Sequence, residues 1–455
     1  MDTEKTVVAI DLGSRWVKVA VAQQDEDGEL HIPAYGVCQA EGFVNGDVKN
    51  MEKLKNCIYT AINEVQQSWG EDIDPSKMPI YYSVSGDKVS GKNTDTETRH
   101  IHNIDYATKI GEVSEEDIRW LKNSLEASIL PNGFKKIGMI TQCFQVDDNE
   151  AIENPIGLNG QEIKAAGHLV TDSQSHIANL ENVIIKAFAV DSDGIEDENI
   201  KLIPVAASLA SSIAVLTEEQ RETGVALVDI GEGCSDLSVF YNKYPVLTWC
   251  CASAGGIITK EIKTLLHNIR TDYAEKLKKE YACANPVKTG NKETVEIEFL
   301  NGERGNLQLE TLAYWVCPIV KHLFENVKNA LNGNIESMTY KGIISQNGVV
   351  ITGGTAALKE IASVAMEVLE LPVRVGKPNI VPIKEFPNLN DDSSYSTLIG
   401  LCKYGIDNYE FSTTEGRKRK RRNASKSARK NGGPGVFVKN SFKNLVETIK
   451  NIQIS

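Results

Sequence analysis

A carboxylate followed by closely spaced glycines marks a stretch of this chain that could bind a phosphate. Residues 225–240 contain a short apolar run, Asp229, a turn with Gly231 and Gly233, and then alternating apolar and polar residues. The glycines allow a sharp turn and a close approach of the backbone to a ligand. A hairpin whose amides point into a cleft beside a carboxylate suits a nucleotide phosphate and its metal ion. One such hairpin is a weak signal.

The same pattern occurs near the N-terminus. Residues 7–21 contain an apolar run, then Asp11, Gly13 and Ser14, and then alternating valines. A repeat of one phosphate-binding hairpin implies two similar lobes that face each other across a cleft. Asp11 and Asp229 would then converge on one magnesium-bound phosphate chain. The alternative is two unrelated hairpins that each carry an incidental aspartate.

Two further glycine pairs could contact the same ligand. In residues 348–358 a strand leads into Gly353 and Gly354 and then into a helix start, and such a turn lets the backbone lie flat against an adenine or a ribose. Gly255 and Gly256 open another predicted helix, whose N-terminus attracts anions. For this second pair a plain tight turn is an equally good interpretation.

Predicted helices and strands surround these turns. Glu275 and Lys278 are three residues apart on one predicted helix face, where a solvated ion pair is the alternative to a binding role. Apolar spacing predicts helices at residues 50–69 and 311–331, with a small-residue helix at 204–216. The small residues of this last helix would allow close packing near the cleft.

Residues from about 87 to 167 have a different character and form a small α+β unit. Ser114 is the predicted N-cap of a helix with acidic residues in its first turn. His100 and His102 could suggest a metal pair. No third ligand has suitable spacing, so we expect exposed histidines on a strand.

Charge is distributed unevenly along the 455 residues. The formal net charge is −13, although residues 412–435 carry +8 and residues 436–455 carry +2, which leaves −23 on the residues before them. Such asymmetry is typical of an interaction tail. Nine cysteines with no C-x-x-C pair suit a reducing cytoplasm and argue against a disulfide framework or a zinc site. We expect neither a signal peptide nor a transmembrane segment.

The C-terminal end is predicted to be a membrane anchor. Residues 412–435 are polar, basic and rich in glycine, which predicts a disordered linker. Residues 436–455 then predict a terminal amphipathic helix that binds a membrane surface, with attraction between the basic run and anionic lipid. A final helix docked on the core and a nucleic-acid tail are the alternatives. The predicted membrane-facing residues are Phe437, Val438, Phe442, Leu445, Val446, Ile449 and Ile452.

Taken in order, these motifs resemble the superfamily of actin and the heat-shock chaperone ATPases. Within it, residues 209–231 and the end of the inserted unit, residues 152–160, resemble the bacterial cell-division FtsA family. The resemblance covers roughly residues 5–410. It implies an α/β, actin-like, duplicated two-lobe ATPase fold with an inserted SHS2-like α+β subdomain. The implied parts are subdomain 1A (1–86 and 168–206), subdomain 1C (87–167), subdomain 2A (207–256 and 326–411), subdomain 2B (257–325), the linker and the terminal helix.

The resemblance also implies ATP and Mg²⁺ as cofactors, with the metal held by Asp11 and Asp229, through water. It implies no catalytic residue, and at most a weak ATPase activity in a cytoskeletal adaptor. Glu275 and Lys278 would meet the ribose and adenine. The implied nucleotide-binding set is Asp11, Gly13, Ser14, Asp229, Gly231, Gly233, Cys234, Gly255, Gly256, Glu275, Lys278, Gly353 and Gly354.

The family's partners follow from the same resemblance. Members polymerise on the inner face of the cell membrane at the division site, bind the C-terminal peptide of FtsZ through subdomain 2B and recruit later division proteins through subdomain 1C. Anionic lipid is a further partner, and no nucleic acid is expected. The alternatives are a pilus-assembly actin-like protein, a sugar or acetate kinase and a chaperone ATPase; the last would need a substrate domain after residue 410.

Four positions depart from the family's pattern. The second loop usually reads Asp-Ile-Gly-Gly-Gly-Thr, but here Glu232 replaces the middle glycine and Cys234 replaces the threonine. A carboxylate aimed at phosphates would weaken binding, whereas one aimed outward costs little. Thr355 replaces the third glycine of the adenosine motif, and Ala207 stands where many relatives place a glutamate that orients water. We therefore predict nucleotide binding with slow or no hydrolysis.

Overall fold

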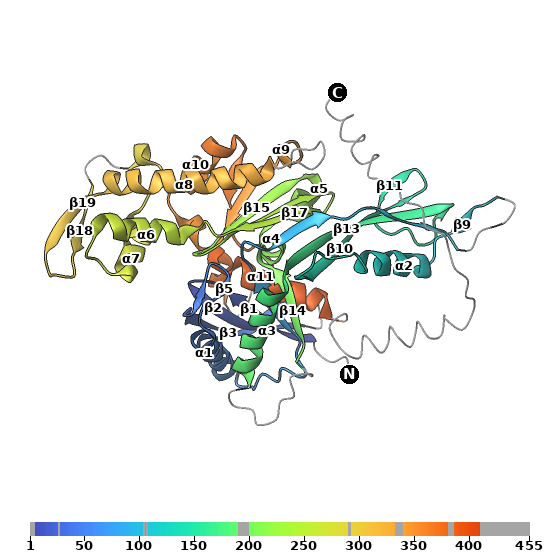
Figure 1. The fold of residues 1–455 in the computed structure, drawn as a ribbon, viewed down its shortest axis with the longest axis horizontal. Coiled ribbons are helices and arrows are strands. Elements are labelled where there is room, and N and C mark those ends of the chain that lie inside the picture. Colours follow the sequence, from blue (N-terminus) through green and yellow to red (C-terminus); the bar gives the residue numbers. More distant parts are fainter. Residues whose placement is uncertain are drawn as a thin grey trace.

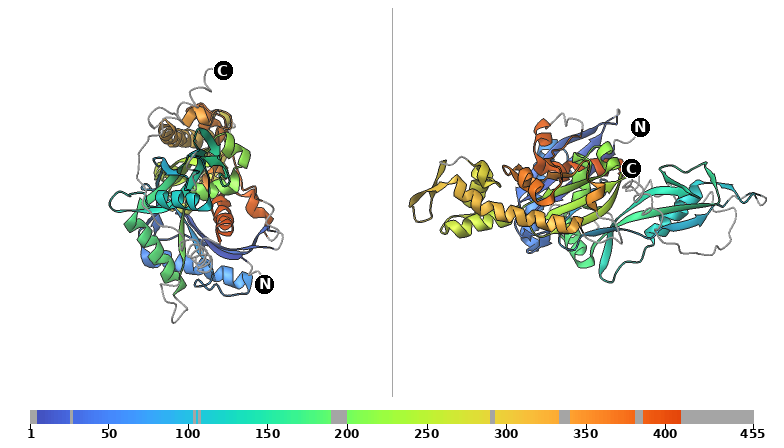
Figure 2. Two further views of the ribbon diagram at one scale, coloured as in Figure 1. Left: turned by 90° about the vertical axis from the view of Figure 1, so that its right-hand side faces the viewer. Right: turned by 90° about the horizontal axis from the view of Figure 1, so that it is seen from above.

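The structure is a computed structural model that describes residues 5–25, 28–102, 105, 108–189, 200–289, 293–332, 340–380 and 386–409. Two lobes stack on each other, and the molecule extends to either side of them (Figure 1). The inserted unit, with α2 (Glu115–Glu126) and β9 (Gly111–Glu112), forms one end of the long axis (Figure 1 and Figure 2). The hairpin of β18 (Thr294–Glu298) and β19 (Arg304–Gln308) forms the other end (Figure 1).

The first lobe is built on a five-stranded sheet whose strand order is β14-β6-β1-β2-β3. Even-numbered side chains of β1, such as Val8 and Ile10, pack with helices α1 and α3. Odd-numbered ones, such as Val7 and Ala9, pack with α4 and α11 on the opposite face. This alternation is the period of a strand that is buried on both faces. The elements are β1 (Lys5–Leu12), β2 (Trp16–Gln24), β3 (Leu30–Gln39), β4 (Phe43–Val44), β5 (Asp47–Val48), α1 (Met51–Trp69), β6 (Ile80–Val84), α3 (Gln174–Phe188), β14 (Leu202–Ala206) and α11 (Ser396–Asp407).

The second lobe repeats this plan. Its hairpin strand β15 pairs antiparallel with β16 and parallel with β20, as β1 pairs with β2 and β6 in the first lobe. One face of β15 packs with the helices α6 (Gly255–Leu266), α8 (Leu309–Leu331) and α10, and the other packs with α4 and α11. The elements are α4 (Ala207–Val215), α5 (Glu218–Thr223), β15 (Val225–Ile230), β16 (Ser235–Tyr241), β17 (Tyr244–Cys251), α9 (Tyr340–Ile343), β20 (Val349–Thr352), η3 (Gly354–Ala357), α10 (Ile361–Leu369), β21 (Val373–Val375), η4 (Pro387–Asp391) and η5 (Ser393–Tyr395).

Helices α4 and α11 lie between the two sheets and join the lobes. A single apolar cluster contains side chains of β1, β15 and both helices. The helices approach so closely that a Cβ on Gly400 would lie 1.8 Å from the carbonyl oxygen of Ala210. The small residues of α4 and α11 therefore set the distance between the sheets, and with it the spacing of the two glycine hairpins.

The inserted unit is continuous with the sheet of the second lobe. Strand β7 pairs with β17 on one side and with the long strand β13 on the other, which extends the sheet to ten strands. Ser114 caps α2 in a capping box with Asp117, which confirms the predicted helix start. Both His100 and His102 are exposed, as expected, although β8 ends at His100. The elements are β7 (Ser90–Asn93), β8 (Glu97–His100), β9 (Gly111–Glu112), α2 (Glu115–Glu126), β10 (Phe134–Val146), β11 (Asn149–Ile152), β12 (Asn159–Gly160) and β13 (Glu162–Ser173).

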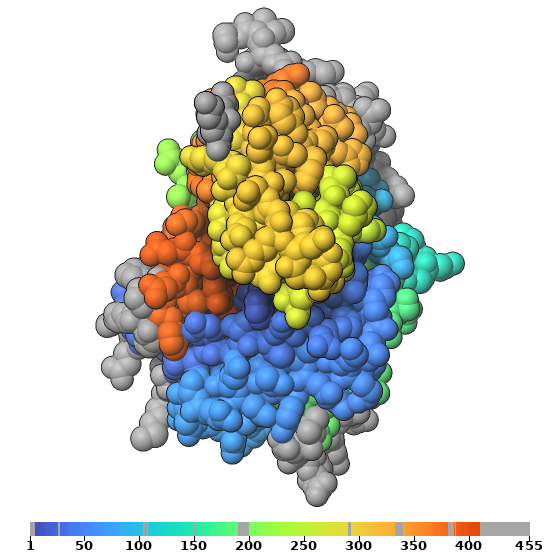
Figure 3. Space-filling model, turned by 90° about the vertical axis from the view of Figure 1, so that its left-hand side faces the viewer, coloured from blue at the N-terminus to red at the C-terminus, as the bar shows by residue number. Residues whose placement is uncertain are grey.

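Residues 255–289 and 293–331 form the upper part of the second lobe and lie above the first lobe (Figure 3). The long amphipathic helix that was predicted at 311–331 is present as α8, which begins at Leu309. The elements are α6 (Gly255–Leu266), α7 (Thr271–Tyr281), η2 (Pro286–Lys288), β18 (Thr294–Glu298), β19 (Arg304–Gln308) and α8 (Leu309–Leu331).

Within the described ranges, no helix is long and apolar enough to cross a membrane. The predicted linker 412–435 and the predicted membrane-binding residues of 436–455 lie outside the described residues. The division into subdomains stays a prediction, and β13 runs unbroken across the predicted boundary at residue 167.

Candidate functional site

One cavity of about 620 Å³ lies between the lobes and collects most of the predicted site residues. Its size is within the range of small-molecule sites in proteins. Of the predicted nucleotide-binding residues, all except Gly255 and Gly256 line it. These are Asp11, Gly13, Ser14, Asp229, Gly231, Gly233, Cys234, Glu275, Lys278, Gly353 and Gly354.

The two glycine hairpins meet directly at this cavity. A Cβ on Gly233 would lie 2.3 Å from Oγ of Ser14 and 2.9 Å from the backbone of Asn45, so only glycine fits between the turns. The backbone N–H of Asn45 donates to Oγ of Ser14 at 3.0 Å, and this bond connects the first turn to the loop between β4 and β5. The hairpins of the two lobes therefore approach as the internal repeat predicted.

Gly255 and Gly256 have a different part in the site. The amide of Gly255 donates to the Gly231 carbonyl at 3.0 Å, and the amide of Gly256 donates to the Glu232 carbonyl at 2.8 Å. The first turn of α6 thus holds the second hairpin in place with the amides that an anion would need. Contact of this pair with a phosphate stays a prediction that the geometry does not favour.

Three buried aspartates lie at the base of the cavity. Asp11 accepts from Lys18 at 2.9 Å and from Ser83 at 3.2 Å. Burial raises the pKa of Asp229 to about 6, against a hydrogen bond from Thr397 at 2.8 Å. Burial, and then the charge of Asp229, raises the pKa of Asp236 to about 7. Carboxylates crowded in this way favour a divalent cation among them.

The opposite wall carries a buried ion pair. Nζ of Lys278 lies 2.7 Å from Oε2 of Glu275. Lys278 is 6% exposed and Glu275 is 3% exposed, so the alternative interpretation of this pair as a solvated ion pair is wrong. Burial alone would raise the pKa of Glu275, but Lys278 outweighs it and holds the pKa below its ordinary value.

The turn after β20 requires a glycine. Gly353 has φ +88°, and a Cβ there would lie 2.3 Å from Oδ1 of Asp229, which explains the glycine.

Comparison with known proteins decides the family. The model of the cell division protein FtsA matches residues 226–400, and the model of the SHS2 domain inserted in FtsA matches residues 96–171. The chain belongs to the FtsA family. It is 29% identical to FtsA of Escherichia coli (strain K12) over 91% of this chain and 94% of that protein, and 28% identical to FtsA of Pseudomonas aeruginosa over 88% and 89%.

Solved structures confirm the actin-like fold. A PilM–PilN type IV pilus biogenesis complex matches with a TM-score of 0.54 at 14% identity, over 88% of this chain and 98% of that one. MreB5 of Spiroplasma citri bound to ADP matches with a TM-score of 0.53 at 12% identity, over 89% and 98%. At these identities the likeness concerns the fold alone.

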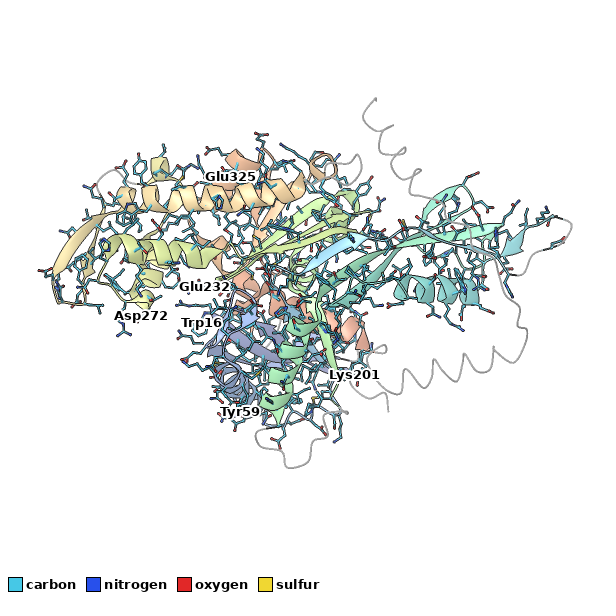
Figure 4. All side chains as sticks on the ribbon, in the orientation of Figure 1. Trp16, Tyr59, Lys201, Glu232, Asp272 and Glu325 are labelled. Carbon is cyan, nitrogen blue, oxygen red and sulfur yellow. The ribbon has the colours of Figure 1, made fainter. Side chains whose placement is uncertain are left out.

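The four residues that depart from the FtsA-family pattern all line the cavity. Glu232 turns toward Lys278, with 3.3 Å between Oε2 and Nζ, and faces the first lobe near Trp16 (Figure 4). Thr355 donates to the Gly231 carbonyl at 2.8 Å, so its hydroxyl supports the second hairpin. Cys234 is buried at the cavity wall, and Ala207 also lines the cavity.

Sequence reasoning missed several charged residues of the cavity, of which Lys18, Asp236 and Arg15 matter most for the site. Lys18 and Asp236 stand opposite Asp11 and Asp229 in their hairpins, seven residues further along in both cases. This equal spacing was a usable signal, because residues opposite each other in a tight hairpin share a face. The third is Arg15, whose Nε is buried and has no hydrogen-bond partner among the described residues. It follows Ser14 directly, and nothing in its spacing distinguished it, nor did the spacing of Lys279 and Asp392, which also line the cavity.

Proposed function

We propose that this protein binds ATP with Mg²⁺ in the cavity between its lobes and acts in cell division as a membrane-attached, filament-forming adaptor. The observation that carries the proposal is the meeting of two equivalent glycine hairpins, each with a buried aspartate, on one cavity in a member of the FtsA family. MreB5 of Spiroplasma citri has been solved bound to ADP and bound to AMPPNP, which supports a nucleotide in the same fold.

The donors of the cavity fit a phosphate chain with its metal ion. Arg15 has an unpartnered buried Nε, within the described part of the chain, and the glycine turns offer backbone amides. Asp11, Asp229 and Asp236 would hold Mg²⁺, directly or through water. The ion would neutralise phosphate charge, and the protein's own residues would fix the position of the nucleotide between the lobes.

Hydrolysis is proposed to be slow. Ala207 begins α4 at the cavity wall and offers no group that could orient or deprotonate water. A long-lived ATP state would suit an adaptor that holds a filament together, because the lobes stay joined through the nucleotide. We therefore propose a nucleotide-dependent cytoskeletal role, with at most a weak ATPase activity.

The partners are proposed from the family and from charge. The FtsZ C-terminal peptide would bind the region of residues 257–325, and other division proteins would bind the inserted unit of residues 87–167. The basic linker 412–435 and the helix at 436–455 would hold the protein on anionic lipid at the inner face of the cell membrane, where the division site forms.

Co-sedimentation with anionic liposomes tests the membrane part of the proposal. The full chain and a chain that ends at Phe411 are compared, each with and without ATP and Mg²⁺. We expect only the full chain to pellet with lipid, and ATP to increase the pelleted fraction through filament formation. If both chains stay in the supernatant, the anchor proposal fails. A calorimetric titration of the shorter chain with ATP tests the cavity separately, and absence of binding there contradicts the nucleotide proposal.

A further inference from the structure

The wall of the cavity around Lys278 presents acceptors and keeps its ammonium donors occupied. An ammonium group has three N–H donors. Nζ of Lys278 lies 2.7 Å from Oε2 of Glu275, 3.2 Å from the carbonyl of Gly255 and 3.3 Å from Oε2 of Glu232. The three acceptors account for the three donors, so this lysine has none left for a phosphate oxygen.

Glu232 adds an acceptor that points into the cavity. Its Oε2 pairs with Lys278, whereas Oε1 accepts no hydrogen bond from any residue that the structure describes. The backbone holds the residue firmly, because its carbonyl accepts from the Gly256 amide at 2.8 Å. A Cβ on Gly256 would lie 2.7 Å from that carbonyl and 3.0 Å from Oε1, so the glycine makes room for the carboxylate.

The charges of this wall select what it can bind. Two carboxylates flank one ammonium, so Glu232, Glu275 and Lys278 together carry one negative charge. Two further cations lie close by: Lys279 is 3.9 Å from Oε1 of Glu275 with its side chain 56% exposed, and Arg15 of the first hairpin also acts on Glu275. Arg15 can meet a phosphate, but phosphates carry negative charge and only accept hydrogen bonds, which makes them poor ligands for the two carboxylates themselves. Hydroxyl groups donate, and a carboxylate accepts from them strongly.

We propose that Glu232 is a specificity-determining acceptor for the ribose hydroxyls of the bound nucleotide, and that it selects ribonucleotides over deoxyribonucleotides. This inference rests on the proposed nucleotide function. The glycine that the family usually has at this position offers no side-chain acceptor, so the selection is a property of this chain. A site built to accept from a hydroxyl rejects the analogue that lacks it, because the acceptor is left unpaired.

The test compares dissociation constants for ATP, 2′-dATP and 3′-dATP, each with Mg²⁺, by titration calorimetry on the full chain. The wild-type protein should bind at least one deoxy analogue about tenfold more weakly than ATP, the usual value of a hydrogen bond to a charged group. In Glu232→Gln and Glu232→Gly this ratio should fall several-fold toward one. Glu280→Gln is the matched control, since Glu280 is exposed on the same helix as Lys278 and lies outside the cavity.

Other outcomes separate the interpretations. If both Glu232 variants bind all three nucleotides more tightly by the same factor, Glu232 repels the phosphates and the inference is overturned. It is also overturned if the ratio stays at its wild-type value while the melting temperature shows a folded variant. If the wild-type protein binds none of the three nucleotides, the proposed function fails, and this inference with it.

Discussion

Nζ of Lys18 lies 2.9 Å from Oδ2 of Asp11, directly across the first hairpin, and also donates to the carbonyl of Ser394 at 2.7 Å. Both side chains are only 10% exposed. The pair therefore joins the first hairpin to the chain segment before α11 and compensates a buried carboxylate. The equivalent position of the second hairpin holds Asp236, opposite Asp229, so the two lobes share a geometry while their charges differ.

Lys18→Met should destabilise the nucleotide-free protein by about 3 kcal/mol, because it leaves the Asp11 carboxylate buried without its cation. The measurement is urea unfolding followed by circular dichroism. Lys53→Met is the control, since Lys53 pairs with Glu41 at 3.0 Å with side chains 60% and 62% exposed. That exposed pair should contribute no more than about 1 kcal/mol. Equal losses in the two variants would contradict the role assigned to Lys18.

Gly233→Ala should weaken ATP binding by about tenfold or more while the fold persists. The new Cβ would lie 2.9 Å from the Asn45 backbone, which cannot rotate away as the Ser14 hydroxyl can, so the two hairpins must separate. Titration calorimetry measures the affinity. Gly342→Ala is the control, because a Cβ there would meet open space. Unchanged affinity in Gly233→Ala would show that hairpin contact is not needed for binding.

His176 should make stability depend on pH. Burial lowers its pKa, but Asp172 at 2.5 Å from Nδ1 and the Gly46 carbonyl at 2.7 Å from Nε2 outweigh burial and raise the pKa above 6.5. A raised pKa means that the folded state holds the proton more tightly, so this stabilisation is complete below pH 6.5 and is lost as pH rises through the folded pKa.

The melting temperature measured from pH 6 to pH 8.5 tests this dependence. It should fall more steeply with pH in the wild-type protein than in His176→Gln. His322→Gln is the control, since the side chain of His322 is 67% exposed. A profile for His176→Gln that runs parallel to the wild-type profile would contradict the assignment.

Ala207→Glu should increase the rate of ATP hydrolysis by about tenfold or more, because it restores a group that can orient and deprotonate water. Ala207 is the first residue of α4, where the helix dipole favours negative charge. Phosphate release at saturating ATP is the measurement. Ala207→Met, which adds length without a base, should keep the wild-type rate; an equal increase in both variants would point to altered packing instead.

The sequence by itself determined the plan of the fold and much of the site. The repeated apolar run, aspartate and glycine turn predicted two equivalent hairpins at Asp11 and Asp229, and both line one cavity. Local rules suffice there, because an apolar strand and a glycine turn are decided by neighbouring residues. The same rules found Ser114 as a cap and the helix that became α8.

Tertiary structure decided which charged groups surround that cavity. Glu275 and Lys278 are compatible with a solvated pair until the packing of α6 and α7 buries them. Gly255 and Gly256 look like an anion site until their amides are seen to donate to the second hairpin. Burial, partners and the direction of a side chain depend on segments far away in the sequence, and residue type with spacing fixes none of them.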